Sequence, residues 1–185
     1  ISGVRNVTDL LLARLREAPG HVAFEVPNPR ESLRDPWTQV STEGFMHYVD
    51  KVARGLIAAG VQTGDTVLVV APTQYLWAVA DFASMFAGAV VVPAYETATA
   101  AELDAIIVEV KPVAVFAGDV ATASRILDSA ERTARNLAIW LLKDGLQGQQ
   151  AAGSIRGIEY LVEQGRGVSD ATLEQHRSKA SLDDV

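Results

Sequence analysis

The sequence contains no cysteine, and this one absence removes three kinds of chemistry. A disulfide framework, a thiolate metal site and a cysteine nucleophile all need the missing side chain. The absence also fits a reducing compartment. We therefore expect a cytoplasmic protein, either free or peripheral at a membrane.

Positive charge is scarce as well. The chain has 16 lysines and arginines against 23 aspartates and glutamates, which gives a formal net charge of −7, and no run of basic residues forms a local exception. Without a positive field, nothing in the chain attracts a phosphate backbone. We therefore expect no nucleic-acid partner.

Apolar stretches of membrane-spanning length are also missing. The longest apolar run, residues 75–92, is interrupted by Asp81, Ser84 and Gly88, and it changes from helix formers to strand formers. The first residues lack the basic region, apolar core and cleavage site of a signal peptide. The sequence therefore predicts no integral membrane segment and no secretory signal.

Standard phosphate and nucleophile motifs are absent too. The chain has no Gly-x4-Gly-Lys-Ser/Thr loop, no dinucleotide glycine fingerprint after the strand expected at 65–71, and no Gly-x-Ser-x-Gly elbow. Its three histidines, His21, His47 and His176, share no metal-ligand spacing, so we expect them to be structural or surface residues. We assign no catalytic, cofactor-binding or metal-binding residue.

What the chain does contain is ordinary globular material. Its 185 residues are 49% hydrophobic and 21% charged, enough for one domain or one incomplete large domain. Leu11, Leu12 and Leu15 lie at helical spacing and predict a helix at 8–18, capped by Thr8 or Asp9. A short strand at 21–26, a proline-punctuated loop at 27–36 and a returning strand at 37–40 follow.

The following region alternates between helix and strand patterns. Phe45, Val49, Val52 and Leu56 form one apolar stripe of a helix at 41–60. Beyond it we expect strands at 65–71, 89–93, 112–116 and 137–142, with helices at 74–87, 100–110 and 121–135. In these strands polar and apolar residues do not alternate, which is typical of strands buried on both faces. The fold class is therefore α/β, a mostly parallel sheet with helices on both faces. Glycines mark a connection beyond residue 143, before a short helix at 155–163 and a polar segment, 165–184, with one exposed helix.

Ligands of parallel sheets bind beyond the carboxyl ends of the strands. Tyr95, Glu96 and Thr97 follow the strand at 89–93 at that edge, and we propose them as substrate-neighbouring residues. A second interpretation stays open, in which Thr97 or Thr99 caps the next helix and Tyr95 packs over the strand end.

Other conspicuous side chains have structural interpretations. Asp119 is expected to cap a helix and not to act as a nucleophile. Glu102 and Asp104 flank a core leucine and are expected on a solvated helix face. Trp77 and Phe82 lie in a nearly all-apolar helix and are expected in the core, not in a pocket.

Three segments, in order, carry a family resemblance. They are Ser-Thr-Glu-Gly-Phe at 41–45, Gly-Val-x-x-Gly-Asp-x-Val at 60–67, and Met-Phe-Ala-Gly-Ala-Val-Val-Val-Pro at 85–93. Together they resemble the start of adenylate-forming (AMP-binding) enzymes. The continuation Tyr95-Glu96-Thr97, with Trp77 before it, is similar to bacterial long-chain fatty-acid CoA ligases of the actinobacterial type. Gly44 departs from the larger residue usual in the first segment, which weakens the helix start.

The resemblance implies that residues 1–185 are part of an incomplete large N-terminal domain. Residues 1–40 would form a helix plus hairpin, 41–142 the alternating core, and 143–185 the connection leading to the family's phosphate loop. That loop, the adenine and ribose contacts and the catalytic lysine would lie after Val185, so none is carried over to this chain.

For the full-length enzyme, the resemblance implies activation of a fatty acid by ATP and Mg²⁺ to acyl-AMP, followed by transfer to coenzyme A. We expect the fragment itself to be inactive and to bind none of these cofactors. Alternative activities are acyl-AMP ligase and carboxylate reductase, and a non-catalytic αβ interaction module is an alternative of another class. A parallel sheet that lacks part of its fold leaves an apolar edge uncovered, so we also expect that the fragment can form a homo-oligomer.

Overall fold

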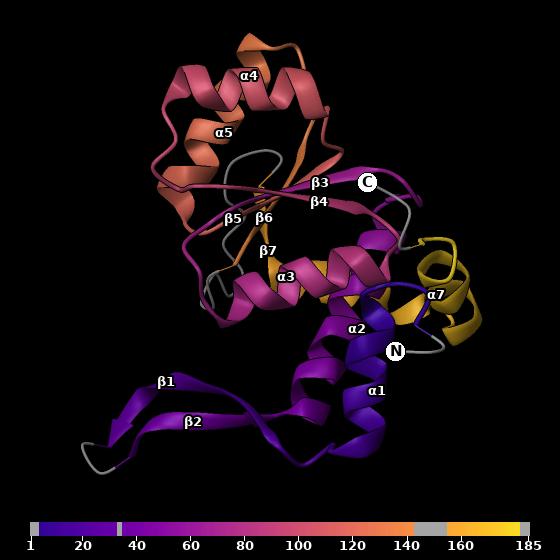
Figure 1. Ribbon diagram of the computed structural model, residues 1–185. Helices are drawn as coiled ribbons and strands as arrows, with labels where there is room; N and C mark the ends of the chain where they lie inside the picture. The colour runs from indigo at the N-terminus through magenta and orange to yellow at the C-terminus, as the bar shows by residue number, and fades with distance from the viewer. Residues whose placement is uncertain (1–3, 33–34, 143–154, 182–185) are drawn as a thin grey trace.

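The computed structural model describes residues 4–32, 35–142 and 155–181 (Figure 1). A two-stranded antiparallel ribbon precedes a five-stranded parallel sheet with strand order β4-β3-β5-β6-β7. The elements are α1 (Thr8–Glu17), β1 (Val22–Ser32), β2 (Asp35–Ser41), α2 (Thr42–Ala58), β3 (Thr66–Val70), α3 (Tyr75–Phe86), β4 (Val90–Ala94), α4 (Ala100–Val110), β5 (Ala114–Ala117), α5 (Val120–Arg132), β6 (Ala138–Leu141), β7 (Ile155–Gly157), α6 (Ile158–Gln164), the 3-10 helix η1 (Gly165–Gly167) and α7 (Asp170–Arg177).

The parallel sheet has helices on both faces, as the sequence predicts. In β3, Val67 and Val69 join the core formed with α2, α3 and α6, whereas Leu68 and Val70 join the core formed with α4 and α5. All four are fully buried. Side chains of a strand alternate between the two faces, so a run of valine and leucine serves both cores.

Strand β3 is central to the predicted scaffold. It pairs in parallel with β4, from Thr66 opposite Val90 to Val70 opposite Ala94, and α3 joins the two strands. On its other side it pairs with β5. The region thus forms neighbouring parallel strands joined by a packed helix, as expected.

The hairpin is longer than predicted. Strand β1 continues to Ser32 and β2 begins at Asp35, so most of the loop expected at 27–36 is strand. Pro27 pairs opposite Trp37, and the register shifts between Pro27 and Ser32. A two-stranded ribbon has only edges, where a proline without an N–H is tolerated. Figure 1 shows the ribbon extending away from the remaining elements.

The start of α1 differs from the prediction. Neither Thr8 nor Asp9 is its cap, because the side-chain oxygen of Asn6 accepts the hydrogen bond from the Thr8 N–H at 3.1 Å. Asp9 instead accepts from the Arg5 N–H at 2.8 Å. The long helix α2 agrees with the prediction, since its whole apolar stripe is buried and Ser41 caps it by accepting from the Gly44 N–H.

The C-terminal part of the described chain differs from the prediction in two places. Ile155 belongs to strand β7, paired in parallel opposite Ile139, and the helix expected at 155–163 begins only at Ile158. Helix α7 is not simply exposed, because it buries Leu173, His176 and Arg177. The predicted connection at 143–154 lies outside the described residues. No helix in the described ranges is long and apolar enough to cross a membrane.

Candidate functional site

The candidate site is the turn between β4 and α4, at the carboxyl edge of the parallel sheet. Strand β4 ends at Ala94, and the Ala98 N–H donates to the Tyr95 carbonyl oxygen at 3.0 Å, which closes the turn. Tyr95 is 83% exposed, Thr97 is exposed and Glu96 is half-buried. The alternative in which Tyr95 packs over the strand end is therefore wrong.

Helix α4 is capped by Thr99 and not by Thr97. The Thr99 hydroxyl accepts from the Glu102 N–H, and the Glu102 carboxylate accepts from the Thr99 N–H at 2.7 Å, forming a capping box. These hydrogen bonds from the Thr99 backbone and hydroxyl hold the pKa of Glu102 below its ordinary value. Thr97 takes no part in this cap.

An open cavity of about 520 Å³ lies beside this turn. Tyr95 and Thr97 line it, whereas Glu96 is not among its lining residues. The remaining walls are mostly small or apolar, with one carboxylate; they are Pro93, Ala94, Ala98, Glu102, Ala105 and Ile106. The structure thus brings two of the three predicted residues to one cleft that has apolar surface and hydroxyl groups.

Arg125 is the residue of this region that sequence reasoning missed. It lies in α5, and its guanidinium donates to the carbonyl oxygens of Ala98, at 2.7 Å, and Glu96. Arg125 does not directly follow a strand, so a pattern based on strand ends does not predict that its side chain reaches this turn from α5.

At the same edge, the turns that follow β3 and β5 pack against each other. A β-carbon at Gly118, after β5, would lie 2.9 Å from Pro72 and 3.2 Å from Ala71, which follow β3. Asp119 caps α5 by accepting from the Thr122 N–H at 2.7 Å, as predicted. Space for a ligand is therefore found beside β4 and not between β3 and β5.

Two further acidic side chains differ in their surroundings. Asp104 is not merely solvated, since its carboxylate binds the Arg132 guanidinium at 2.8 and 2.9 Å and accepts from the Ser129 hydroxyl, and these partners lower its pKa. In α3, burial raises the pKa of Asp81. The neighbouring Trp77 and Phe82 pack against the main core, as expected.

The histidines occupy the structural and surface places expected for them. His176 is buried, with its Nδ1 3.1 Å from the Ala87 carbonyl oxygen, whereas His21 and His47 are exposed. Within the described ranges, no three histidine, aspartate or glutamate side chains are grouped to hold a metal ion.

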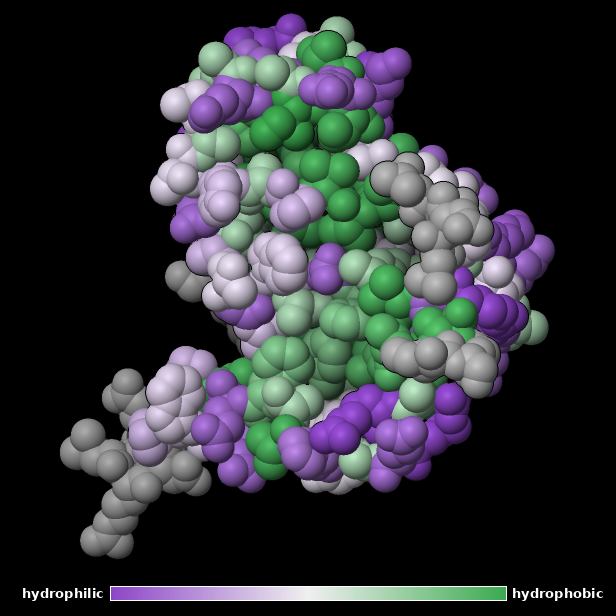
Figure 2. Space-filling model, viewed as in Figure 1, coloured by the Kyte–Doolittle hydropathy of each residue, from purple (hydrophilic) through white to green (hydrophobic). Residues whose placement is uncertain are grey.

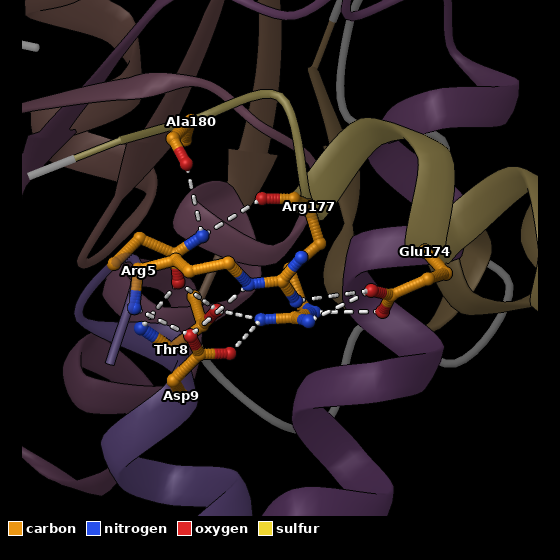
Figure 3. Close-up of polar contacts among 7 residues, drawn as sticks. Arg5, Thr8, Asp9, Glu174, Arg177 and Ala180 are labelled. Carbon is orange, nitrogen blue, oxygen red and sulfur yellow. Dashed lines mark hydrogen bonds and ion pairs between the residues drawn. The ribbon is translucent and has the colours of Figure 1, made fainter. Parts of the chain in front are cut away.

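Away from the candidate site, a polar cluster around Arg177 joins the two ends of the described chain (Figure 3). Arg177 is 3% exposed and donates to Asp9 at 2.6 Å, to Thr8 at 2.8 Å and to Glu174 at 2.8 Å. Hydrogen bonding to Glu174 raises the pKa of Arg177. The Asn6 amide donates to the carbonyl oxygens of Arg177 and Ala180. Because the chain's own groups satisfy this buried charge, the cluster is structural.

Comparison with known proteins identifies the family. The profile of the AMP-binding enzyme family matches residues 13–174. The long-chain fatty-acid CoA ligase FadD15 of Mycobacterium tuberculosis is 33% identical over 112 residues, which cover 60% of this chain and 18% of that ligase. FadD15 of Mycobacterium bovis matches with the same identity and coverage.

Solved structures share the fold. Coronafacic acid ligase from Pectobacterium brasiliense superposes with a TM-score of 0.71 at 16% identity, over 89% of this chain and 30% of that one. The A-PCP didomain of carboxylic acid reductase from Segniliparus rugosus, in complex with AMP, gives a TM-score of 0.68 at 17% identity, over 91% of this chain and 27% of that one. The chain therefore spans less than a third of the length of these relatives. Given the profile match along most of its length, this chain belongs to the AMP-binding, adenylate-forming enzyme family.

Proposed function

We propose that the chain is the N-terminal part of the AMP-binding domain of a long-chain fatty-acid CoA ligase. The observation that carries this proposal is its 33% identity to the mycobacterial ligases over 112 residues. The Tyr95-Glu96-Thr97 turn, at the carboxyl edge of the sheet, supports it. Within the domain, we propose that residues 1–40 supply the helix and hairpin, 41–142 most of the sheet core, and 143–185, which also contribute β7 to the sheet, the connection toward the phosphate loop.

The proposed reaction has two steps. A fatty carboxylate oxygen attacks the α-phosphorus of ATP, and the bond to pyrophosphate breaks to give acyl-AMP. The thiolate of coenzyme A then attacks the acyl carbonyl carbon and displaces AMP. Mg²⁺ bound to ATP would offset the phosphate charge. We assign no residue of this chain to ATP, Mg²⁺ or coenzyme A.

The role proposed for this chain is to place the substrate beside the sheet edge. Tyr95 and Thr97 line the cleft, and its apolar walls, Ala94 and Ile106 among them, suit part of an acyl substrate. Glu96 is proposed to act through its backbone in the turn. In this view the chain supplies a binding surface and no reacting group.

The face around β4 supports a role as part of a larger assembly. Figure 2 shows apolar residues gathered along the face that contains β4, α3 and α4. Val90 at the edge strand is 44% exposed, and Val108 in α4 is 53% exposed. Contiguous apolar surface usually marks an interface. We propose that further polypeptide covers it in the full-length enzyme, and that the chain alone self-associates there.

A second candidate activity is carboxylate reduction. The similarity to the adenylating didomain of a carboxylic acid reductase supports it at the level of the fold. Acyl-AMP ligase is a further adenylate-forming alternative.

A cytoplasmic location, free or peripheral at a membrane, remains a prediction from the sequence.

The proposal is tested by ATP–pyrophosphate exchange. The 185-residue chain should give no exchange with any fatty acid, because it lacks the phosphate loop. The polypeptide encoded by the whole gene should exchange with long-chain fatty acids and form acyl-CoA when coenzyme A is added. An aldehyde product would favour the reductase, and a stable acyl-AMP the acyl-AMP ligase. Exchange by the 185-residue chain alone would contradict the assignment.

A further inference from the structure

Arg125 is a half-buried arginine whose guanidinium binds backbone carbonyl oxygens of a turn. It belongs to α5, which follows β5, yet its side chain contacts the turn that follows β4. Its two terminal nitrogens bind separate carbonyl oxygens, those of Ala98 and Glu96. In the part of the chain that the structure describes, it forms no ion pair. Its described polar contacts are therefore all with this turn.

The chemistry of arginine fits this contact closely. The guanidinium is planar and always charged, and its two terminal nitrogens form a rigid fork. The two acceptors are two residues apart in one tight turn, so the fork holds both of them at once. A lysine ammonium is a point charge and has no such fork. Hydrogen bonds from a charged donor are also stronger than neutral ones.

Among the hydrogen bonds of the described residues, the others that hold this turn lie at its two ends. The Ala98 N–H closes it onto Tyr95, and the capping box fixes Thr99 at the start of α4. The Glu96 peptide lies between these points, with the exposed Tyr95 and Thr97 on either side. The described hydrogen bond to the Glu96 carbonyl oxygen comes from Arg125.

We propose that Arg125 is a positioning residue: its guanidinium fixes the turn at 95–98 and thereby holds Tyr95 and Thr97 at the cleft. This inference rests on the proposed function for its catalytic meaning, but the clamp itself is a property of this chain. Without the fork, the turn should open locally while the sheet and α5 remain folded.

The first test measures amide hydrogen exchange by NMR in the 185-residue chain. Arg125→Met keeps an apolar stem of similar length, and we expect its Ala98 amide to exchange roughly tenfold faster, as after loss of a charge-assisted hydrogen bond. Arg125→Lys should give an intermediate value, because one ammonium can bind one carbonyl at a time. In Arg125→Ala, added methylguanidinium should restore slow exchange, which a general loss of packing would not allow.

Arg132→Met is the matched control. Arg132 also lies in α5 and binds α4 through Asp104, but it does not contact the turn. Its substitution should leave the Ala98 amide unchanged. Equal acceleration in Arg132→Met, or no acceleration in Arg125→Met, would overturn the clamp.

The second test uses the polypeptide encoded by the whole gene. There, Arg125→Met should raise KM for the fatty acid several-fold with a smaller change in kcat, and Arg132→Met should change neither. Unaltered kinetics in Arg125→Met, alongside an active parent, would reject positioning and leave the ligase assignment intact. A parent without adenylation activity would reject the ligase assignment and the catalytic meaning of the clamp, whereas the exchange data would still decide whether the clamp exists.

Discussion

A β-carbon at Gly55 in α2 would lie 2.3 Å from the carbonyl oxygen of Leu161 in α6. The two helices therefore meet backbone to backbone. Gly165 approaches the same place, since its β-carbon would lie 2.5 Å from the Gly55 nitrogen. This contact fastens the segment after β7 to α2, and only glycine leaves room for it.

We expect Gly55→Ala to lower the free energy of unfolding by about 1–2 kcal/mol, measured by urea titration. In an open helix the same change would stabilise the protein by about 1 kcal/mol, but overpacking costs about 1–3 kcal/mol. Gly44→Ala in the same helix is the control. Its nearest neighbours would be 3.5 and 3.6 Å away, so it should be neutral or stabilising. A stabilised Gly55→Ala protein would disprove the close contact.

The Thr63 hydroxyl is buried and has no hydrogen-bond partner within residues 4–32, 35–142 and 155–181. Thr63→Val replaces this hydroxyl with a methyl group of similar shape, so we expect the thermal midpoint to rise, with a gain in free energy of roughly 1 kcal/mol. Thr8→Val is the contrasting variant, because the Thr8 hydroxyl accepts from Arg177. It should be destabilising. Equal effects of the two substitutions would argue against an unsatisfied hydroxyl at Thr63.

The Arg177 cluster should make stability depend on pH. The Arg5 N–H, with Arg177, lowers the pKa of Asp9, and the Arg177 guanidinium lowers the pKa of Glu174. Because both folded-state pKa values are lowered, the stabilisation is complete above the ordinary carboxyl pKa of about 4 and is lost as pH falls through the lowered values.

Arg177→Met should therefore reduce the free energy of unfolding at pH 7 by roughly 1–3 kcal/mol and weaken its fall on acidification. Urea titrations between pH 7 and pH 2 would measure both effects. Arg14→Met removes an exposed arginine of α1 and should leave the pH profile as it is. Parallel profiles for Arg177→Met and the unmodified chain would show that the cluster contributes no pH-dependent stability.

The sheet could be predicted because its signals are local. The helix expected at 100–110 is α4, and the strand expected at 65–71 contains β3. Glycines also mark the starts of two strands, where the backbone has a positive φ. Gly64, with a φ of 87°, precedes β3, and Gly88, with a φ of 78°, precedes β4. Apolar runs and turn glycines report on residues that are neighbours in the chain.

Apart from the loop expected at 27–36, which is mostly strand of a local hairpin, the errors concern contacts between distant segments. Strand β7 has three residues, too few to show a period, and it is a strand because Ile155 pairs opposite Ile139. Asn6 bonds to Arg177, 171 residues away, so its role at the start of α1 had no local signal. Arg125 was missed for the same reason, since nothing in its own helix indicates that it reaches the turn after β4.

The β4 edge gives a final prediction about association. Among the described strands, β4 lies at one end of the sheet order, and Val90 is exposed on it. An unpaired edge with apolar side chains tends to pair with another chain, and a lysine on such an edge opposes pairing.

Sedimentation velocity should show that the 185-residue chain self-associates and that Val90→Lys shifts it toward monomer. Val108→Lys changes an exposed valine of α4, away from the strand edge, and should have a smaller effect. A clean monomer at high concentration would contradict self-association, and equal effects of the two lysines would place the contact on the wider apolar face instead of the edge.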